Sequence, residues 1–200
     1  MAHPATTARM TYGEYLAAEG VSVIRHEFLN GEVWAMSGGT PEHSALAAAV
    51  IQALGNALRG KPCRVFTSDL RVRVADTGLS TYPDVTIVCD QVETAPEDAD
   101  AVTNPVVLVE ILSDSTEAYD RGAKFAHYRR LPSLQAYVLV SQAEPRIEVY
   151  RRTDAGQWLL SEARGGETIE IAPLAVTLDV NAVYANPLEA KTAGPTSSSP

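Results

Sequence analysis

Two acidic residues, each beside an apolar run typical of a strand, are the side chains best suited to chemistry. Asp84 follows Pro83 and opens the run 85–89, and Glu110 lies inside the run 106–112. The second run is apolar enough to predict a buried central strand. Because an ionised carboxylate is costly to remove from water, Glu110 needs a cation, a metal or a protonated neighbour. Carboxylate oxygens are hard ligands, so the pair predicts a site for Mg²⁺ or Mn²⁺.

A lysine that could complete this site lies on the helix predicted over 117–130. Asp120 and Lys124 are four residues apart and His127 is three further on, so the three project from one helix face. That face can turn toward Glu110. An ammonium beside two metal-binding carboxylates suits phosphodiester hydrolysis, because it can orient the attacking water or offset charge on the phosphate.

These motifs resemble the PD-(D/E)XK nuclease superfamily, which has the restriction-endonuclease-like fold. More closely, the chain is similar to the bacterial Uma-two-type endonuclease family over about residues 10 to 185. In the superfamily a lysine follows the glutamate by two residues; here that position is Leu112, and within the family Lys124 takes its place. The matching segments are 26–32, His43, 67–72, 82–85, 109–116, Asp120, Lys124 and Tyr128.

The resemblance implies a Mg²⁺- or Mn²⁺-dependent endonuclease that hydrolyses phosphodiester bonds in DNA. Asp84 and Glu110 would hold the metal together with the backbone carbonyl of Ile111. Lys124 would orient the attacking water or stabilise developing charge, and Asp120 would help to hold Lys124. The family also implies a homodimer, whose twofold symmetry suits duplex DNA.

Two further residues are candidates for catalytic roles in the same site. Glu27 shares a strand face with Leu29, so it either joins the site as a third acidic group, as the resemblance implies, or pairs with an arginine. His43, in the first turn of a long predicted helix, could approach the cleft, cap the helix or pack in the core. Asp69 could support the site or shape a bulge.

The three central residues also have ordinary structural explanations. Asp84 could cap a turn after Pro83, Glu110 could form an internal ion pair, and Lys124 could be an exposed helix residue. Two other functions therefore stand beside the DNA endonuclease. One is a nuclease-fold scaffold that binds without cleaving, which Leu112 and the acidic composition favour. The other is a metal-dependent hydrolase of a small phosphodiester.

The predicted elements form an α+β fold, with a restriction-endonuclease-like mixed sheet flanked by helices and an N-terminal β-hairpin. Thr11 and Glu14 predict a capping box, Asn30-Gly31 a hairpin turn, and Thr40 the cap of a long helix. Residues 10–186 are expected to form one domain, with 1–9 and 187–200 disordered. Strands are predicted at about 25–29, 32–36, 64–67, 69–75, 84–89, 106–112, 136–140, 146–151, 158–163 and 168–171, and a last short helix near Pro173 or Asp179.

Composition and net charge limit the classes of protein to which this chain can belong. The 200 residues are 46% hydrophobic and 20% charged, which suits one compact domain, and no apolar run is long enough to span a membrane. The net charge of −9 argues against a protein that coats nucleic acid through bulk electrostatics. Two basic clusters could still contact DNA or could be solvated faces; they are Arg64, Arg71 and Arg73, and Arg121, Lys124, Arg129 and Arg130.

The two cysteines and the N-terminus bear on location. Cys63 and Cys89 both lie in strand-like apolar contexts, so each is expected to be a buried, reduced thiol. The first residues contain no apolar signal segment. A cytoplasmic protein is therefore expected.

Overall fold

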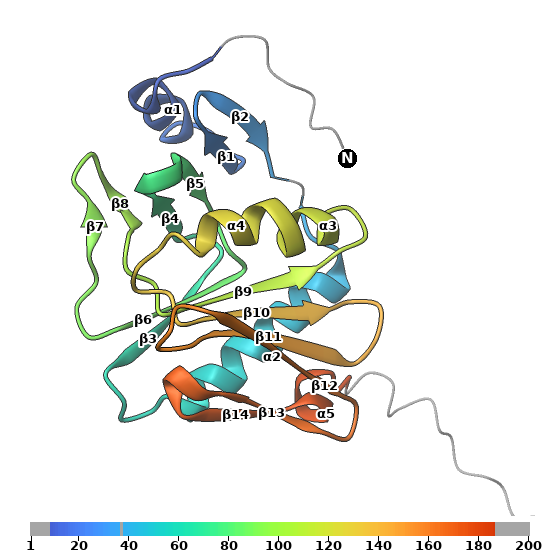
Figure 1. Ribbon diagram of the computed structural model, residues 1–200. Coiled ribbons are helices and arrows are strands. Elements are labelled where there is room, and N and C mark those ends of the chain that lie inside the picture. The colour runs from blue at the N-terminus through green and yellow to red at the C-terminus, as the bar shows by residue number, and fades with distance from the viewer. Residues whose placement is uncertain (1–8, 37, 187–200) are drawn as a thin grey trace, which may run out of the picture.

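The computed structural model describes residues 9–36 and 38–186, which form a mixed α+β structure with two large sheets (Figure 1). The fold class expected from the sequence is confirmed, including the N-terminal hairpin. The segments expected to be disordered, 1–9 and 187–200, lie outside the described residues except for Arg9.

One sheet gathers the N-terminal hairpin and four short strands, and the other contains the longer central strands. The first sheet has the order β2 (Glu32–Ala35), β1 (His26–Leu29), β5 (Leu79–Thr81), β4 (Arg71–Val74), β8 (Asp98–Val102), β7 (Thr94–Ala95). The second has the order β12 (Trp158–Arg164), β11 (Arg146–Arg152), β10 (Ala136–Ser141), β9 (Val107–Leu112), β6 (Val85–Cys89), β3 (Cys63–Thr67). A separate pair consists of β13 (Thr168–Ile171) and β14 (Val176–Asp179).

Helical segments connect and cover these sheets. They are α1 (Tyr12–Glu19), α2 (Pro41–Ala57), α3 (Glu117–Tyr119), the π-helical turn η2 (Asp120–Lys124), α4 (Phe125–Tyr128), α5 (Val180–Val183), and the 3-10 turns η1 (Ala75–Thr77) and η3 (Ala172–Leu174). The last short helix expected from the sequence is α5, which is capped by the side chain of Asp179.

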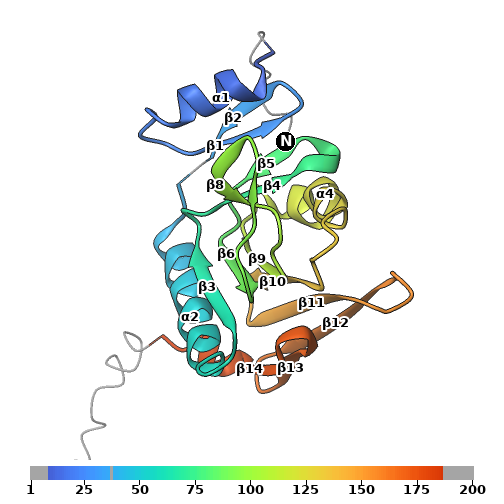
Figure 2. The ribbon, with the colours of Figure 1, turned by 90° about the vertical axis from the view of Figure 1, so that its left-hand side faces the viewer.

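Strand β9 is the centre of the second sheet, because it pairs with β6 in antiparallel and with β10 in parallel orientation. Its residues Val107, Val109 and Ile111 belong to a core cluster with the apolar stripe of α2. Leu108 and Leu112 belong to a second cluster, which includes residues of α4 and of the first sheet. Figure 2 shows α2 and α4 on opposite sides of these strands. Since strand residues alternate between faces, Glu110 points to the α4 side.

Several local signals in the sequence produce the structures expected of them. Thr11 and Glu14 form the capping box of α1, and the Thr40 hydroxyl accepts a hydrogen bond from the backbone N–H of His43 at the start of α2. The turn between β1 and β2 places Asn30 and Gly31 at φ 49° and 95°. Both angles are left-handed, a region that asparagine and glycine tolerate better than other residues.

Other segments differ from the sequence-based expectations. The helix expected over 117–130 ends at Tyr128, and its middle is η2. The acidic stretch 93–100, which is not among the strands predicted from the sequence, contains β7 and the start of β8. Buried Arg71 binds the carboxylate of Asp98 at 2.7 Å, and this ion pair lets a polar segment join the sheet.

The expectation of two reduced cysteines is wrong. Cys63 and Cys89 form a disulfide, and no free cysteine is present in the described chain. The two residues lie directly opposite each other in the antiparallel pair β3 and β6, so their side chains emerge on the same face of the sheet. Reasoning from each cysteine alone could not show this register.

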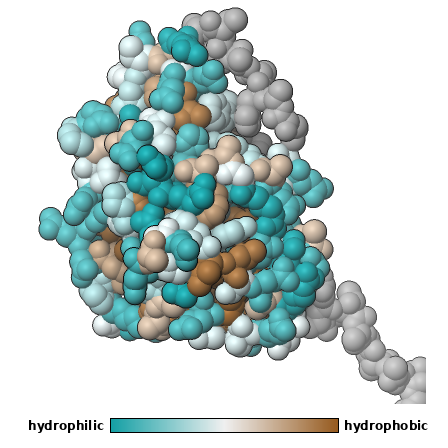
Figure 3. Space-filling model, viewed as in Figure 1, coloured by the Kyte–Doolittle hydropathy of each residue, from teal (hydrophilic) through white to brown (hydrophobic). Residues whose placement is uncertain are grey.

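The surface seen in Figure 3 is mostly hydrophilic, with a compact hydrophobic patch in its lower half. The edge strand β12, in the lower half of this view, exposes Leu159 and Leu160. Within residues 9–36 and 38–186, no helix is long and apolar enough to cross a membrane.

Candidate active site

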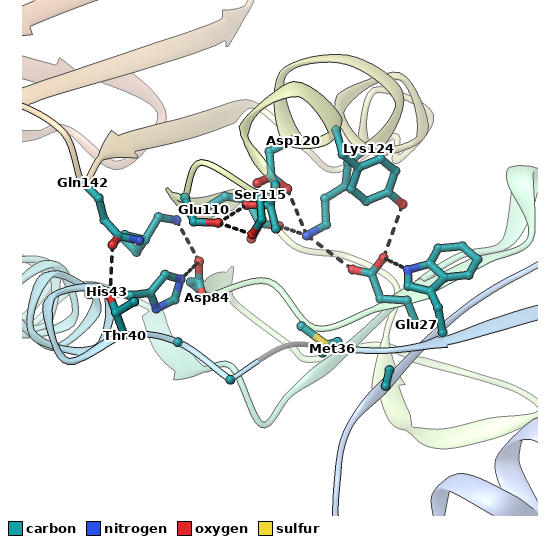
Figure 4. A pocket seen from close by; sticks show the side chains of 18 residues that line it. Glu27, Met36, Thr40, His43, Asp84, Glu110, Ser115, Asp120, Lys124 and Gln142 are labelled. Atoms are coloured by element: carbon teal, nitrogen blue, oxygen red, sulfur yellow. Dashed lines mark hydrogen bonds and ion pairs between the residues drawn. The ribbon is translucent and has the colours of Figure 1, made fainter. Parts of the chain in front are cut away.

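A cavity of about 280 Å³ lies where the C-terminal end of β9 meets the first turn of α2 and the segment from α3 to α4. Among the described residues that line it, four carboxylates face only one lysine and one histidine. Figure 4 shows these side chains pointing toward one another. The lining residues discussed below are Glu27, Thr40, His43, Asp84, Glu110, Ile111, Asp120, Lys124 and Gln142.

The strand register brings the two central carboxylates together. Val85 of β6 pairs with Val109 of β9. Because the strands are antiparallel, the preceding residue Asp84 and the following residue Glu110 lie opposite each other. Asp84 accepts a hydrogen bond at 2.7 Å from the backbone N–H of Ile111. Glu110 is 4% exposed and accepts a hydrogen bond at 2.8 Å from the Tyr128 hydroxyl. Both carboxylates are therefore fixed in orientation.

Lys124 is the central cation of the cavity. Its Nζ lies 2.9 Å from Glu110, 3.3 Å from Asp120 and 3.4 Å from Glu27. The π-helical turn η2 contains both Asp120 and Lys124 and buries them on the side facing β9. Such turns often occur at functional sites. Leu112, at the position of the superfamily's usual lysine, is buried in the core instead.

Burial and charge act in opposite directions on this pair. Burial raises the pKa of Glu110 well above its usual value, although Lys124 opposes the change. Burial would lower the pKa of Lys124, but the charges around it, with Glu110 the strongest, raise that pKa well above its usual range. Lys124 is thus an ammonium at neutral pH, held beside a carboxylate that is costly to keep ionised.

Glu27 reaches the cavity from the N-terminal hairpin. It pairs in register with Trp34, whose ring N–H donates to Glu27 at 3.1 Å. Hydroxyls of Thr81 and Tyr119 also donate to the Glu27 carboxylate. Its ionic partner is Lys124, so the alternative of a salt bridge to an arginine is not what the structure shows.

His43 approaches from the first turn of α2. Its Nε2 lies 3.3 Å from the carboxylate of Asp84. The hydrogen bond to Asp84 is the largest cause of a raised pKa for His43, and burial opposes it. His43 thus contacts Asp84, one of the three metal ligands expected from the sequence, and both residues line the cavity together with Ile111.

The oxygens present suit a hard divalent cation. In the described part of the chain, no three His, Cys, Asp or Glu side chains converge closely enough to form a metal site by themselves. The expected set of Asp84, Glu110 and the Ile111 carbonyl contains only two side chains and would leave other positions to water. Mg²⁺ characteristically keeps several waters and binds few carboxylates. The excess of carboxylates over cations also favours a bound cation.

The structure therefore brings together all five side chains expected to act in catalysis, Glu27, His43, Asp84, Glu110 and Lys124. It does not bring His127 into the cavity lining. Asp69 is exposed and binds Arg25 at 3.5 Å.

The basic clusters are mostly neutralised. Arg71 and Arg73 pair with Asp98 and Glu97, and Arg121 pairs with Glu117 and Glu148. Arg64, Arg129 and Arg130 are exposed.

Sequence reasoning missed the neutral residues that hold the charged ones. Tyr128, Trp34 and Thr81 bind site carboxylates, and Gln142 lines the cavity after β10. Tyr128 carried a signal, since it belongs to the motif that resembles the family. Thr81 and Gln142 are far in sequence from their partners Glu27 and Thr40, so only the folded sheets bring them near. Trp34 lies opposite Glu27 in the hairpin whose Asn30-Gly31 turn the sequence predicts.

Comparison with known proteins identifies relatives along most of the chain. Residues 13–181 match the model of the Uma2 family, described as putative restriction endonuclease. The uncharacterized protein slr1290 of Synechocystis sp. is 36% identical over 174 residues, covering 86% of this chain and 89% of that protein. The uncharacterized protein sll1609 of the same organism is 34% identical over 167 residues, covering 84% and 94%.

A solved structure shares the fold. It is a putative nuclease belonging to DUF820 from Anabaena variabilis, with a TM-score of 0.70 and 15% sequence identity. The match covers 88% of this chain and 98% of that one. At this identity the likeness concerns the fold alone.

Proposed function

Because this chain belongs to the Uma2 family of putative restriction endonucleases, we propose that it is a Mg²⁺- or Mn²⁺-dependent endonuclease that hydrolyses phosphodiester bonds in DNA. The observation that supports this most strongly is the placement of Lys124 beside Glu110, at 2.9 Å, in a cavity that also contains Asp84. A lysine from the helix thus reaches the glutamate even though Leu112 occupies the usual lysine position.

The proposed roles follow from the geometry. Asp84, Glu110 and the carbonyl of Ile111 would hold the metal, which would polarise the phosphate and lower the pKa of a bound water. Lys124 acts as a fixed positive charge rather than as a base, because its neighbouring carboxylates keep it protonated. It orients the attacking water and stabilises the negative charge that develops on the phosphate oxygens.

Three residues support these roles. Asp120 and Glu27 hold the ammonium of Lys124 from two further directions, which fixes its position. Tyr128 fixes the rotamer of Glu110 through its hydroxyl, and burial raises the pKa of that hydroxyl so that it remains a donor. His43 orients Asp84, whose hydrogen bond raises the pKa of the imidazole.

A plasmid assay tests the proposal. Supercoiled DNA is incubated with the protein and Mg²⁺ or Mn²⁺, with EDTA as the control, and nicked and linear products are measured over time. We expect products only with a divalent cation. Intact plasmid under all these conditions, with a protein shown to be folded, would contradict DNA cleavage.

Two alternatives predict different results in the same assay. A small-phosphodiester hydrolase would leave plasmid intact but cleave bis(p-nitrophenyl) phosphate or a cyclic dinucleotide, and the acidic net charge of −9 would not hinder it. A scaffold with a nuclease fold would bind DNA without cleaving either substrate. Calorimetric titration with Mn²⁺ then distinguishes a site that binds metal from one that does not.

A further inference from the structure

We propose that Gln142 is a substrate-binding residue whose side-chain amide donates a hydrogen bond to a non-bridging oxygen of a nucleic-acid phosphate. The inference rests on the proposed function, since it assigns one contact with the phosphodiester. Gln142 lies in the connection from β10 to β11 and lines the same cavity as Asp84 and Glu110. Because β10 runs parallel to β9, this connection lies beside the end of β9 that carries the acidic site.

The orientation of the amide is set by α2. The hydroxyl of Thr40 accepts a hydrogen bond from the backbone N–H of His43, so its own proton can be donated elsewhere. It lies 3.1 Å from the side-chain oxygen of Gln142. Because Thr40 binds the oxygen of the Gln142 amide, the Nε2 group of the amide can donate to a different partner. Nε2 is buried, and no described residue accepts a hydrogen bond from it.

A buried donor without an acceptor is unusual, because buried polar groups are nearly always hydrogen-bonded. The segment that carries Gln142 is also held in place. The hydroxyl of Tyr184 lies 2.6 Å from the carbonyl oxygen of Ser141 and 2.8 Å from that of Arg146, at the two ends of the connection. The N–H of Ala143 donates to the side chain of Ser141. Gln142 is thus positioned before any ligand arrives, which favours binding.

The arrangement of charge indicates what the donor would bind. Figure 4 shows Gln142, Thr40 and His43 at one end of the cavity and Glu27 and Lys124 at the other. An amide NH₂ group only donates, so its ligand must present an acceptor. A phosphodiester between the two ends would direct one oxygen toward Lys124 and another toward Gln142. The amide adds a neutral donor where a further cation would compete with the metal for the carboxylates.

Kinetics with matched variants test this role. Gln142→Leu removes the donor, and Gln142→Glu keeps the acceptor for Thr40 but replaces the donor with a negative charge. Gln52→Leu, at an exposed position of α2, is the control. We expect the KM for a DNA duplex to rise roughly tenfold or more in both Gln142 variants, since hydrogen bonds to charged groups are the stronger ones. The Mg²⁺-induced shift in melting temperature should persist.

Phosphorothioate substrates locate the contact. Replacing one non-bridging oxygen with sulfur at a single phosphate should weaken the binding of wild-type protein, measured by fluorescence anisotropy, for one stereoisomer. The loss of affinity caused by that stereoisomer should be absent in Gln142→Leu and present in Gln52→Leu. An equal effect in all three proteins would overturn the assignment.

The outcomes separate this inference from the proposed function. If wild-type protein cleaves or binds DNA and Gln142→Leu does so with unchanged KM and affinity, the inference fails alone. If Gln142→Glu loses thermal stability but not DNA affinity, the amide serves the fold and the inference again fails. If wild-type protein neither cleaves nor binds DNA, both fail together.

Discussion

Lys124 is buried among three carboxylates, so its removal tests both the charge and the fold. Lys124→Met keeps the apolar stem and removes the ammonium. We expect cleavage to fall by about a hundredfold or more, the scale of losing a positioned charge at the transition state. Lys124→Arg should not restore the rate, because a planar guanidinium cannot occupy the place of a compact ammonium.

Stability must be measured alongside, because the remaining carboxylates would lose their partner. Lys61→Met is the control, since Lys61 binds the carbonyls of Leu174 and Ala175, and neither it nor they line the cavity. Wild-type cleavage by a folded Lys124→Met protein would remove this residue from the mechanism.

His43 makes the stability of the metal-free protein depend on pH. Its pKa is raised above the ordinary 6.5, chiefly by Asp84. The stabilisation is therefore fully present below about pH 6.5 and is lost as the pH rises through the folded-state pKa. In EDTA, the difference in melting temperature between wild type and His43→Gln should be largest at low pH and shrink toward high pH. A difference independent of pH would show that the imidazolium does not stabilise the fold.

Among the elements, the disulfide joins the edge strand β3 to β6, at the end of β6 that is far from Asp84. Cys63 and Cys89 are 26 residues apart, and a loop of this size corresponds to about 3 kcal/mol in chain-entropy models. Unfolding in urea should show a loss of this order for the double variant Cys63→Ala, Cys89→Ala. Thiol titration of the denatured, unreduced wild type should detect no free cysteine. Two titratable thiols per chain, or equal stability of the two proteins, would contradict this expectation.

Elements with a strong local signal were predictable from the sequence. The capping box at Thr11, the Asn30-Gly31 turn, and the apolar run around Glu110 depend on neighbours in the chain, and the structure contains each of them. The short polar strands β5, β7 and β8 were not predictable in this way. They form because distant segments pair with them, as when Asp98 meets Arg71. The disulfide depends on the same long-range register.

In the candidate site, too, some features could be predicted from the sequence and others depend on contacts between distant segments. The chemistry of Asp84, Glu110 and Lys124 could be inferred from residue type and family resemblance, but their contacts depend on the register of β6 with β9 and on the place of η2 beside β9. Trp34 faces Glu27 through the register of the β1–β2 hairpin, which its two-residue turn fixes locally. The place of Gln142 depends on the pairing of β9 with β10, and its orientation depends on Thr40 of α2; no local pattern in the sequence encodes either of them.

At the scale of the whole molecule, the family resemblance leads us to expect a homodimer. Light scattering coupled to gel filtration should give twice the 21.4 kDa of one chain at micromolar concentration. Two sites related by a twofold axis would then suit the two strands of duplex DNA. A monomer mass across the concentration range would contradict the expectation and would favour a substrate with a single scissile strand.

The central claim, that the cavity around Glu110 cleaves DNA, is tested most directly by comparing two glutamates in one row of the sheet. Glu110 of β9 and Glu148 of β11 both lie opposite Leu139, and both are 4% exposed. Only Glu110 lines the cavity, whereas Glu148 pairs with Arg121 and Arg146. The measurement is the initial rate of Mg²⁺-dependent plasmid cleavage by folded Glu110→Gln and Glu148→Gln proteins. We expect a loss of at least about a hundredfold for Glu110→Gln and a rate near wild type for Glu148→Gln. Equal rates in the two variants would show that Glu110 has no catalytic role.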